Sequence, residues 1–213
     1  MRLLFLIILP LLALTCTRAP RFPAPTEPDQ IAVGGGCDGC DLMFSEMPKT
    51  INAVDTSAGW NEKGRKLIIK GTVFRLDGKT PAPNVIIYYW QTDHNGLYSK
   101  GKTKTASINH GHIRGWMKTA ADGKYTLHTI RPASYPEGNN PEHIHIAIKE
   151  PGKTVYYIDE FTFDDDPLLD DNNRGRMENR GGNGILKPTK FNDLQTAEHV
   201  IILGKNIPDY PKQ

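Results

Sequence analysis

From residue 66 onward, the chain alternates between short apolar segments and turns. The apolar segments are rich in β-branched and aromatic residues, which favour strands. They are Lys66–Phe74, Asn84–Trp90, Lys124–Ile130, His143–Ile148, Val155–Phe163 and Ala197–Leu203. Between residues 66 and 163, no stretch shows the apolar period of 3.6 that marks an amphipathic helix. The pattern predicts an all-β fold, a β-sandwich of mostly antiparallel strands with long loops.

Turn-forming residues separate these strands. Asp77-Gly78 predicts a hairpin between the first two segments, and Thr80–Pro83 adds a second turn element. Asp122-Gly123 predicts another turn, directly before the strand that begins at Lys124. The segment Asn172–Gly184 is rich in Gly, Asn and Arg, and we expect it to be a long loop.

Residues 1–16 have a different pattern, with one arginine followed by an apolar run from Leu3 to Leu14. The run is shorter than the roughly 20 residues that a membrane-spanning helix needs, so a signal peptide is predicted. Its end, LALTC, resembles the lipobox of bacterial lipoproteins, which makes Cys16 a candidate lipidation site and membrane anchor. The alternative is simple cleavage near Thr15–Ala19. Either outcome predicts an exported protein, periplasmic or attached to a membrane as a lipoprotein.

The next two segments lead into the sandwich. Residues 17–36 form a Pro/Gly-rich stretch, predicted to be a flexible tether. Residues 37–65 form an N-terminal arm, and residues 66–213 form the β-sandwich domain. The arm begins with Cys37 and Cys40, for which an exported protein favours a local disulfide. A redox motif would need a βαβ context, and a zinc site would need two further ligands.

Composition narrows the classes of function. The 213 residues include 26 basic and 24 acidic ones, for a net charge of +2. This balance excludes the basic footprint of a nucleic-acid-binding protein, so no nucleic-acid partner is expected. The chain has only three cysteines, which excludes a disulfide-rich scaffold.

The strongest local chemical signal is the pair His143 and His145. Residues i and i+2 of a strand point to the same face, so both imidazoles lie on one side, opposite Ile144 and Ile146. Two imidazoles placed in this way can bind one metal ion. The alternative is a half-polar strand with two unrelated histidines.

This strand completes an ordered series of motifs that resembles the intradiol ring-cleavage dioxygenases, such as the protocatechuate and catechol dioxygenases. The matching pieces are Trp90-Gln91-Thr92-Asp93, Gly96-Leu97-Tyr98, Thr119–Pro136, His143-Ile144-His145 and Phe163–Leu168. The resemblance extends from about Gly71 to Leu169, which is roughly half the chain. Five motifs in the same order and spacing make the resemblance specific.

The resemblance implies a non-haem Fe(III) site with Tyr98, Tyr135, His143 and His145 as ligands. Two phenolates offset part of the charge of Fe(III), and a bound metal lowers the pKa of tyrosine. In this family a catechol-type substrate displaces the ligand at the position of Tyr135, whose phenolate then acts as a base. Molecular oxygen is inserted between the two hydroxyl carbons, giving a cis,cis-muconate-type product. Family members commonly form dimers or larger assemblies.

Two positions depart from the family. Asn140 stands where the family has an arginine that stabilises negative charge developing on the bound ring. Glu160 stands where a glutamine is usual, and a carboxylate there disfavours an anionic substrate. Both residues are therefore candidates for contact with the substrate, and both leave the identity of the diol open.

The segment Asn109–Trp116 contains a candidate replacement for the missing charge. Arg114 would bring a positive charge to the pocket, and His110 and His112 would offer hydrogen bonds to a substrate. The alternative is an ordinary exposed loop without a role in the reaction.

Two other functions compete with ring cleavage. Gly71–Phe74 and Gly78–Pro83 also resemble transthyretin-like sandwiches, which act as non-catalytic binding modules on cell surfaces. A binding module does not require tyrosines and histidines in this order, so their presence favours the dioxygenase. An iron-binding homologue without ring-cleavage activity is the third interpretation, because of Asn140 and Glu160.

Overall fold

The computed structural model describes residues 30–101 and 107–212. The predicted signal peptide with Cys16, and the tether up to residue 29, lie outside the described residues. None of the helices in the described part has the length and hydropathy that a membrane span requires.

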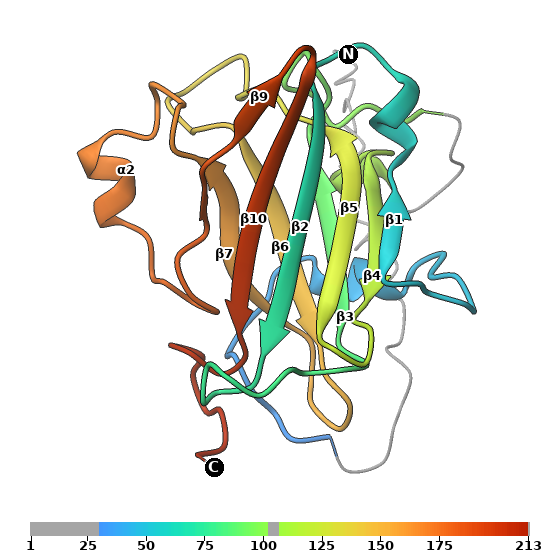
Figure 1. Cartoon of the computed structure of the whole chain (residues 1–213), viewed down its shortest axis with the longest axis vertical. Helices are drawn as coiled ribbons and strands as arrows, with labels where there is room; N and C mark the ends of the chain where they lie inside the picture. Colours follow the sequence, from blue (N-terminus) through green and yellow to red (C-terminus); the bar gives the residue numbers. More distant parts are fainter. Residues whose placement is uncertain (1–29, 102–106, 213) are drawn as a thin grey trace, which may run out of the picture.

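Two five-stranded sheets pack face to face and confirm the predicted all-β sandwich (Figure 1). The first sheet has the order β1 (Val54–Thr56), β5 (Lys124–Ile130), β2 (Lys66–Phe74), β10 (Leu194–Ile202) and β9 (Thr189–Phe191). The second has the order β4 (Arg114–Lys118), β3 (Ile86–Gln91), β6 (His143–Lys149), β7 (Tyr156–Phe163) and β8 (Ile185–Leu186). The helices are short: η1 (Cys40–Phe44), η2 (Ala58–Asn61), α1 (Ser107–His110) and α2 (Asp171–Gly175). Most neighbouring strands are antiparallel, but β1–β5, β2–β10 and β7–β8 are parallel.

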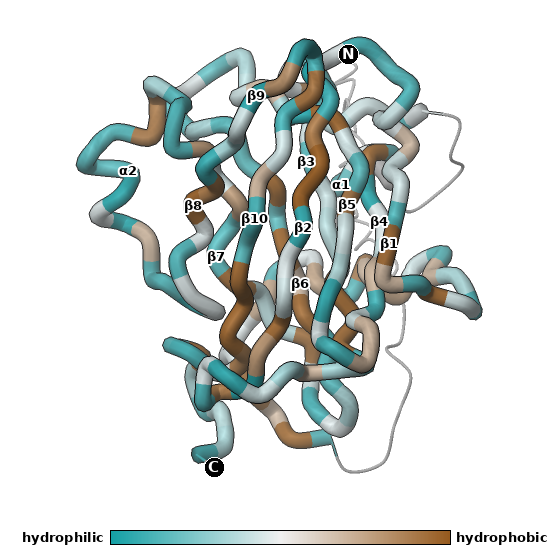
Figure 2. The backbone as a smooth tube through the Cα atoms, in the orientation of Figure 1, coloured by the Kyte–Doolittle hydropathy of each residue, from teal (hydrophilic) through white to brown (hydrophobic). Residues whose placement is uncertain are grey.

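The core lies between the two sheets, where alternate residues of each strand point inward. Leu67 and Ile69 of β2 are fully buried and belong to the same cluster as Ile144, Ile146 and Ile148 of β6. Each such side chain contributes about 1.5–3 kcal/mol by leaving water. In Figure 2 the strands carry the brown, hydrophobic segments, and the chain around α2 is mainly teal. Because the isoleucines of β6 face this core, its two histidines face the opposite side of the second sheet.

The turn at Asp77-Gly78 forms as predicted, but it does not connect two paired strands. The Asp77 carboxylate accepts hydrogen bonds from the amides of Lys79 and Thr80, both at 2.8 Å. The chain folds back only far enough for Phe74 to bridge Pro81. It then crosses to the other sheet, so β2 and β3 lie in different layers and the predicted hairpin is wrong. A turn sequence specifies the local reversal but not the strand that is paired afterwards.

The strand β4 overlaps a segment for which an exposed loop was the alternative. It pairs with β3, with Trp116 opposite Tyr88 and Arg114 opposite Trp90. Its charged ends hide the strand pattern in the sequence. Three further short strands, β1, β8 and β9, also escape prediction, because strands this short are defined by their partners.

The first part of the N-terminal arm, around η1, covers the outer face of the second sheet, whereas its β1 belongs to the first sheet. Cys40 and Met43 are buried in a cluster with Tyr88 and Trp90 of β3. Trp116 of β4 donates a hydrogen bond from its indole Nε1 to the Met43 carbonyl at 2.7 Å. The structure joins Cys37 and Cys40 in a disulfide, with Cα atoms 5.5 Å apart. The arm therefore forms a partial third layer over the face that carries His143 and His145.

Candidate metal centre

Four side chains converge on the outer face of the second sheet. Tyr98 Oη lies 2.8 Å from Tyr135 Oη and 2.8 Å from His145 Nε2. Tyr135 Oη lies 3.1 Å from His143 Nε2. Tyr98 comes from the loop after β3, Tyr135 from the loop after β5, and both histidines from the start of β6. The structure thus brings together all four ligands that the resemblance implies.

The loop that carries Tyr98 is held by Asp93. The Asp93 carboxylate accepts hydrogen bonds from the amides of Asn95, at 2.8 Å, and Leu97, at 3.2 Å, and from the Ser99 hydroxyl. Gly96 has a φ of 78°, and a side chain there would overlap the carbonyl oxygen of Ser134. Glycine therefore lets the Tyr98 loop touch the loop of Tyr135.

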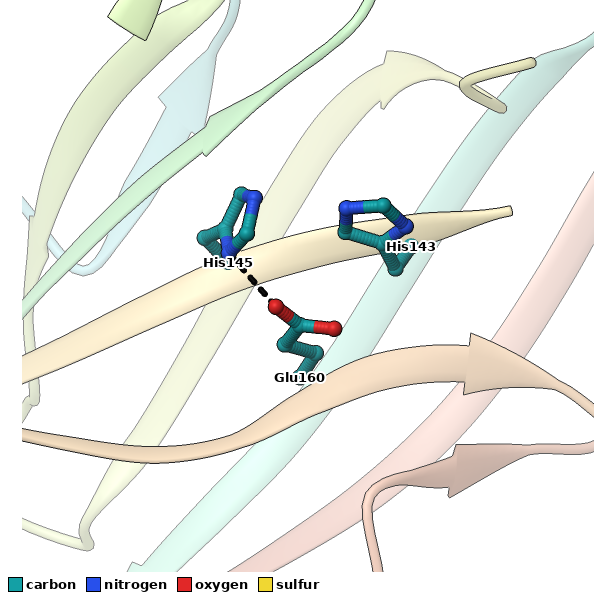
Figure 3. Close-up of side chains that lie close together, drawn as sticks. All are labelled: His143, His145 and Glu160. Carbon is teal, nitrogen blue, oxygen red and sulfur yellow. Dashed lines mark ion pairs between the residues drawn. The ribbon is translucent and has the colours of Figure 1, made fainter. Parts of the chain in front are cut away.

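Both histidines are oriented through the nitrogen that faces away from the tyrosines. His145 donates from Nδ1 to Glu160 Oε1 at 2.7 Å, and Figure 3 shows this pair beside His143. His143 donates from Nδ1 to the carbonyl oxygen of Pro141 at 2.6 Å. Acceptors on Nδ1 fix the tautomer, so both Nε2 atoms remain available as metal ligands.

Glu160 lies close enough to both histidines to be considered as a ligand itself. One donor atom from each of His143, His145 and Glu160 lies within 4.8 Å of the others. However, Glu160 contacts the nitrogen of His145 opposite the one that faces Tyr98. Glu160 therefore supports His145 from behind and does not join the four converging donor atoms.

Burial sets the protonation of the four groups. It raises the pKa of Tyr98 well above its ordinary value, and the hydrogen bond with Tyr135 adds to the rise. Burial also raises the pKa of Tyr135 and lowers the pKa of His143. Without a cation, the two phenols and the imidazole of His143 are neutral at pH 7. A bound cation is what would favour the phenolates.

Trp90 packs on one face of His145. Their rings stack with centroids 4.7 Å apart, and the other face of Trp90 stacks on His110 at 4.1 Å. His110 Nδ1 is 2.9 Å from Tyr88 Oη, and burial lowers the pKa of His110 to about 3. This imidazole is therefore a neutral packing group behind Trp90.

The structure does not bring Arg114 or His112 to the four donor atoms. The Arg114 guanidinium is buried, pairs with Glu46 at 2.6 Å, and is separated from His145 by Trp90 in the strand order. His112 lies at the loop of Tyr98, where its Nε2 is 2.7 Å from Glu62 Oε1. Arg114 therefore anchors the N-terminal arm to the sheet.

A cavity of about 300 Å³ opens beside His143. Asn140 and Glu160, the two positions that depart from the family, both line it. So do Thr162 and Arg176, which no sequence signal indicated. Thr162 Oγ1 is buried, and it and the Arg176 guanidinium have no hydrogen-bond or ion-pair partner among residues 30–101 and 107–212. The cavity thus places one positive charge near His143, on a wall that also carries the carboxylates of Asp159, Glu160 and Glu178.

Comparisons with known proteins find similar sequences. A family profile described as dioxygenase matches residues 43–180. Catechol 1,2-dioxygenase 2 of Acinetobacter lwoffii is 28% identical over 163 residues, covering 66% of this chain and 58% of the relative. The protocatechuate 3,4-dioxygenase beta chain of Burkholderia cepacia is 30% identical over 148 residues, covering 66% and 60%.

The fold is also found among solved structures. Wild-type catechol 1,2 dioxygenase of Acinetobacter radioresistens superposes with a TM-score of 0.56 at 18% identity, covering 79% of this chain and 62% of that one. At this identity the likeness shows the fold alone. The chain spans about half the length of the curated relatives that it matches.

Proposed function

This chain belongs to the intradiol dioxygenase family, and we propose that it uses O2 to cleave a catechol-type ring between its two hydroxyl carbons. One observation carries the proposal. Two phenol oxygens and two imidazole nitrogens meet within hydrogen-bonding distance, although they come from three separate segments. Tyr98 contacts both Tyr135 and His145, and Tyr135 also contacts His143. A binding module has no need for that convergence.

The donor set fits a non-haem Fe(III) ion. Phenolate oxygens are hard, charged donors, and the imidazoles are neutral donors with their Nδ1 atoms already engaged. When bound, Fe(III) would supply a Lewis acid that holds the diol and prepares its ring for attack by O2. Four protein ligands would leave room for a substrate at the same ion.

Tyr135 is the residue that we expect to move a proton. Its Oη is hydrogen-bonded to both Tyr98 and His143, so it can leave either partner while the other three donors stay in place. Once displaced by a diol, the phenolate oxygen would accept a proton from a substrate hydroxyl. Tyr98 and the two histidines would keep their positions, because Asp93, Glu160 and the Pro141 carbonyl hold them.

The cavity beside His143 is the place for the ring of the diol. Arg176 offers the only guanidinium among the described residues along the wall of this cavity. We propose that Arg176 replaces the charge that the family has at the position of Asn140. The ring would then develop negative charge near a cation supplied by a different segment of the chain.

We further propose that the protein is exported, as its first residues predict, and works in the periplasm or as a lipoprotein attached through Cys16. The disulfide between Cys37 and Cys40 is suited to an oxidising compartment. Radiolabelled palmitate incorporation, lost in Cys16→Ser, would test the anchor. Incorporation that persists in the variant would contradict it.

The visible spectrum and iron content of the chain without residues 1–16 test the central proposal. We expect one iron per chain and a tyrosinate charge-transfer band that Tyr98→Phe or Tyr135→Phe weakens. Tyr125→Phe is the matched control, because Tyr125 is buried in the core and its hydroxyl has no partner among the described residues. The band should then change when a catechol is added, with uptake of O2.

Each result has one meaning for the proposal. A protein that stays colourless after iron loading overturns the dioxygenase and favours the transthyretin-like binding module. A coloured protein that takes up no O2 with any diol is the iron-binding homologue without ring cleavage. Oxygen uptake that survives Tyr98→Phe unchanged would show that the reaction occurs elsewhere.

A further inference from the structure

The disulfide-closed turn Cys37–Cys40 lies over His145, and the cavity beneath it shares Tyr157, Ile158 and Glu160 with the cavity beside His143. One cavity of about 170 Å³ is lined by Cys37 and Asp38 on the turn and by Trp90, His145 and Glu160 below it. A second cavity, of about 280 Å³, is lined by Asp38 and Gly39 above and by Tyr98, His110 and His145 below. Asp38, Trp90 and His145 line both cavities, so the turn divides the space above the ligand His145.

The turn is fixed to the sheet at several points. Cys40 is 1% exposed and packs in the cluster with Trp90. Gly39 has a φ of 76°, and a side chain at this position would come within 3.0 Å of His110 Nε2. Farther along, Arg114 anchors the arm through Glu46. These contacts therefore fix the position of the short disulfide loop above the stacked rings of His110, Trp90 and His145.

Asp38 places a carboxylate on this turn. Its side chain is exposed, borders both cavities, and has no hydrogen bond or ion pair within residues 30–101 and 107–212. The family match begins at residue 43, so the turn lies outside the part of the chain that the family profile covers. The contacts of the turn with the metal centre are therefore not accounted for by the family match.

We propose that the turn Cys37–Cys40 is a specificity-determining wall of the active site, whose disulfide limits the size of the diol and whose Asp38 disfavours anionic diols. The proposal rests on the proposed function for its substrate class. A wall closed by a disulfide cannot spread to admit a bulky ring substituent. A carboxylate on the diol would meet the like charge of Asp38 at the mouth of these cavities, where the repulsion is strongest at low ionic strength.

The first test is the double variant Cys37→Ser/Cys40→Ser, which opens the loop without a reductant that would also reduce iron. Turnover of catechol and of 4-tert-butylcatechol is compared. We expect the ratio of kcat/KM for the bulky diol to that for catechol to rise about tenfold, within the range of pocket-size discrimination. The charge-transfer band should stay unchanged. An unchanged ratio in a folded, coloured variant would overturn the role of the disulfide.

Asp38→Asn tests the wall without opening it, in case the double variant fails to fold. The ratio of kcat/KM for 3,4-dihydroxybenzoate to that for catechol should rise severalfold. Asp41→Asn is the matched control, because Asp41 follows the turn directly, in η1, and borders neither of the two cavities. Equal ratios in both variants and in the wild type would contradict the charge effect.

A readout without iron or turnover separates this proposal from the proposed function. In the iron-free protein, the carbethoxylation rates of His110 and His145 by diethyl pyrocarbonate are followed by mass spectrometry. Both rates should rise in the double variant, while the rate of His128, on the first sheet, should not. Faster modification with no diol turned over by the wild type would uphold the wall and reject the dioxygenase. Unchanged rates would reject the wall.

Discussion

Glu160 Oε1 accepts a hydrogen bond from His145 Nδ1 at 2.7 Å, while the opposite nitrogen of that imidazole faces Tyr98 Oη at 2.8 Å. The residue that departs from the family therefore contacts one of the four proposed metal ligands. A carboxylate behind an imidazole fixes its tautomer and makes its free nitrogen a stronger donor.

Replacing Glu160 should weaken iron binding, and more so when the new side chain cannot accept a hydrogen bond from His145. Glu160→Leu removes it, and we expect iron affinity to fall about 10–100-fold, as is usual when a supporting partner of a metal ligand is lost. Glu160→Gln keeps an acceptor oxygen and should lose less. Competition with a chelator measures both affinities, and Glu178→Gln, on the same cavity but exposed, is the control. Equal losses for Gln and Leu would argue against the hydrogen bond.

Replacing Arg176 should lower the rate of the reaction, whereas replacing Arg114 should lower the stability of the fold. Arg176→Gln removes the cation from the cavity wall, and we expect kcat/KM to fall by up to about 10²-fold, as for one lost electrostatic stabiliser, with little change in unfolding free energy. Arg114→Gln breaks the pair with Glu46 and should cost about 1.5–3 kcal/mol of stability. Steady-state oxygen uptake and urea unfolding of both variants give the comparison. A larger kinetic effect from Arg114 would reverse the assignment.

Arg131 should stabilise the segment that carries Tyr135 and His143. It is 3% exposed, and its guanidinium bonds Glu142 and, at 2.8 Å, Asp165. Arg131→Met removes the charged hydrogen bonds to both carboxylates, while Glu142 keeps Arg65 and Asp165 stays half exposed, and should cost about 1.5–3 kcal/mol in chemical unfolding. Arg65 pairs with the same Glu142 but has a 53% exposed side chain, so Arg65→Met should cost less than about 1 kcal/mol. Similar losses in the two variants would contradict this role.

His199 should make the iron-free protein less stable in mild acid. It is buried against Phe161, with ring centroids 4.5 Å apart, and burial lowers its pKa from 6.5 to about 4. Between these values the unfolded chain binds a proton that the folded chain does not, so stability falls as the pH drops. From pH 7 to pH 5, His199→Leu should lose about 2 kcal/mol less than the wild type. Urea unfolding at both pH values measures the difference, and parallel losses would rule out His199.

The strands and the four converging donors could be predicted from the sequence because their signals are local. The bounds of β2 and β5 match the prediction, since alternation and β-branched residues record burial on one face. His143 and His145 share a face because the strand repeats every two residues. That Tyr98 and Tyr135 lie beside these histidines was predicted from the family resemblance, because no local sequence pattern shows that residues of three separate segments meet.

Tertiary structure alone decided which groups accompany those donors. Arg114 was a candidate for the pocket, but pairing of β4 with β3 sets it behind Trp90. Arg176 and Thr162 enter the cavity because distant segments pack beside β6, and the Cys37–Cys40 turn reaches His145 because the arm folds across the sheet. Periodicity and turn chemistry act between near neighbours in the sequence. Which strand pairs with which, and which loop covers a face, depends on the free energy of packing the whole chain.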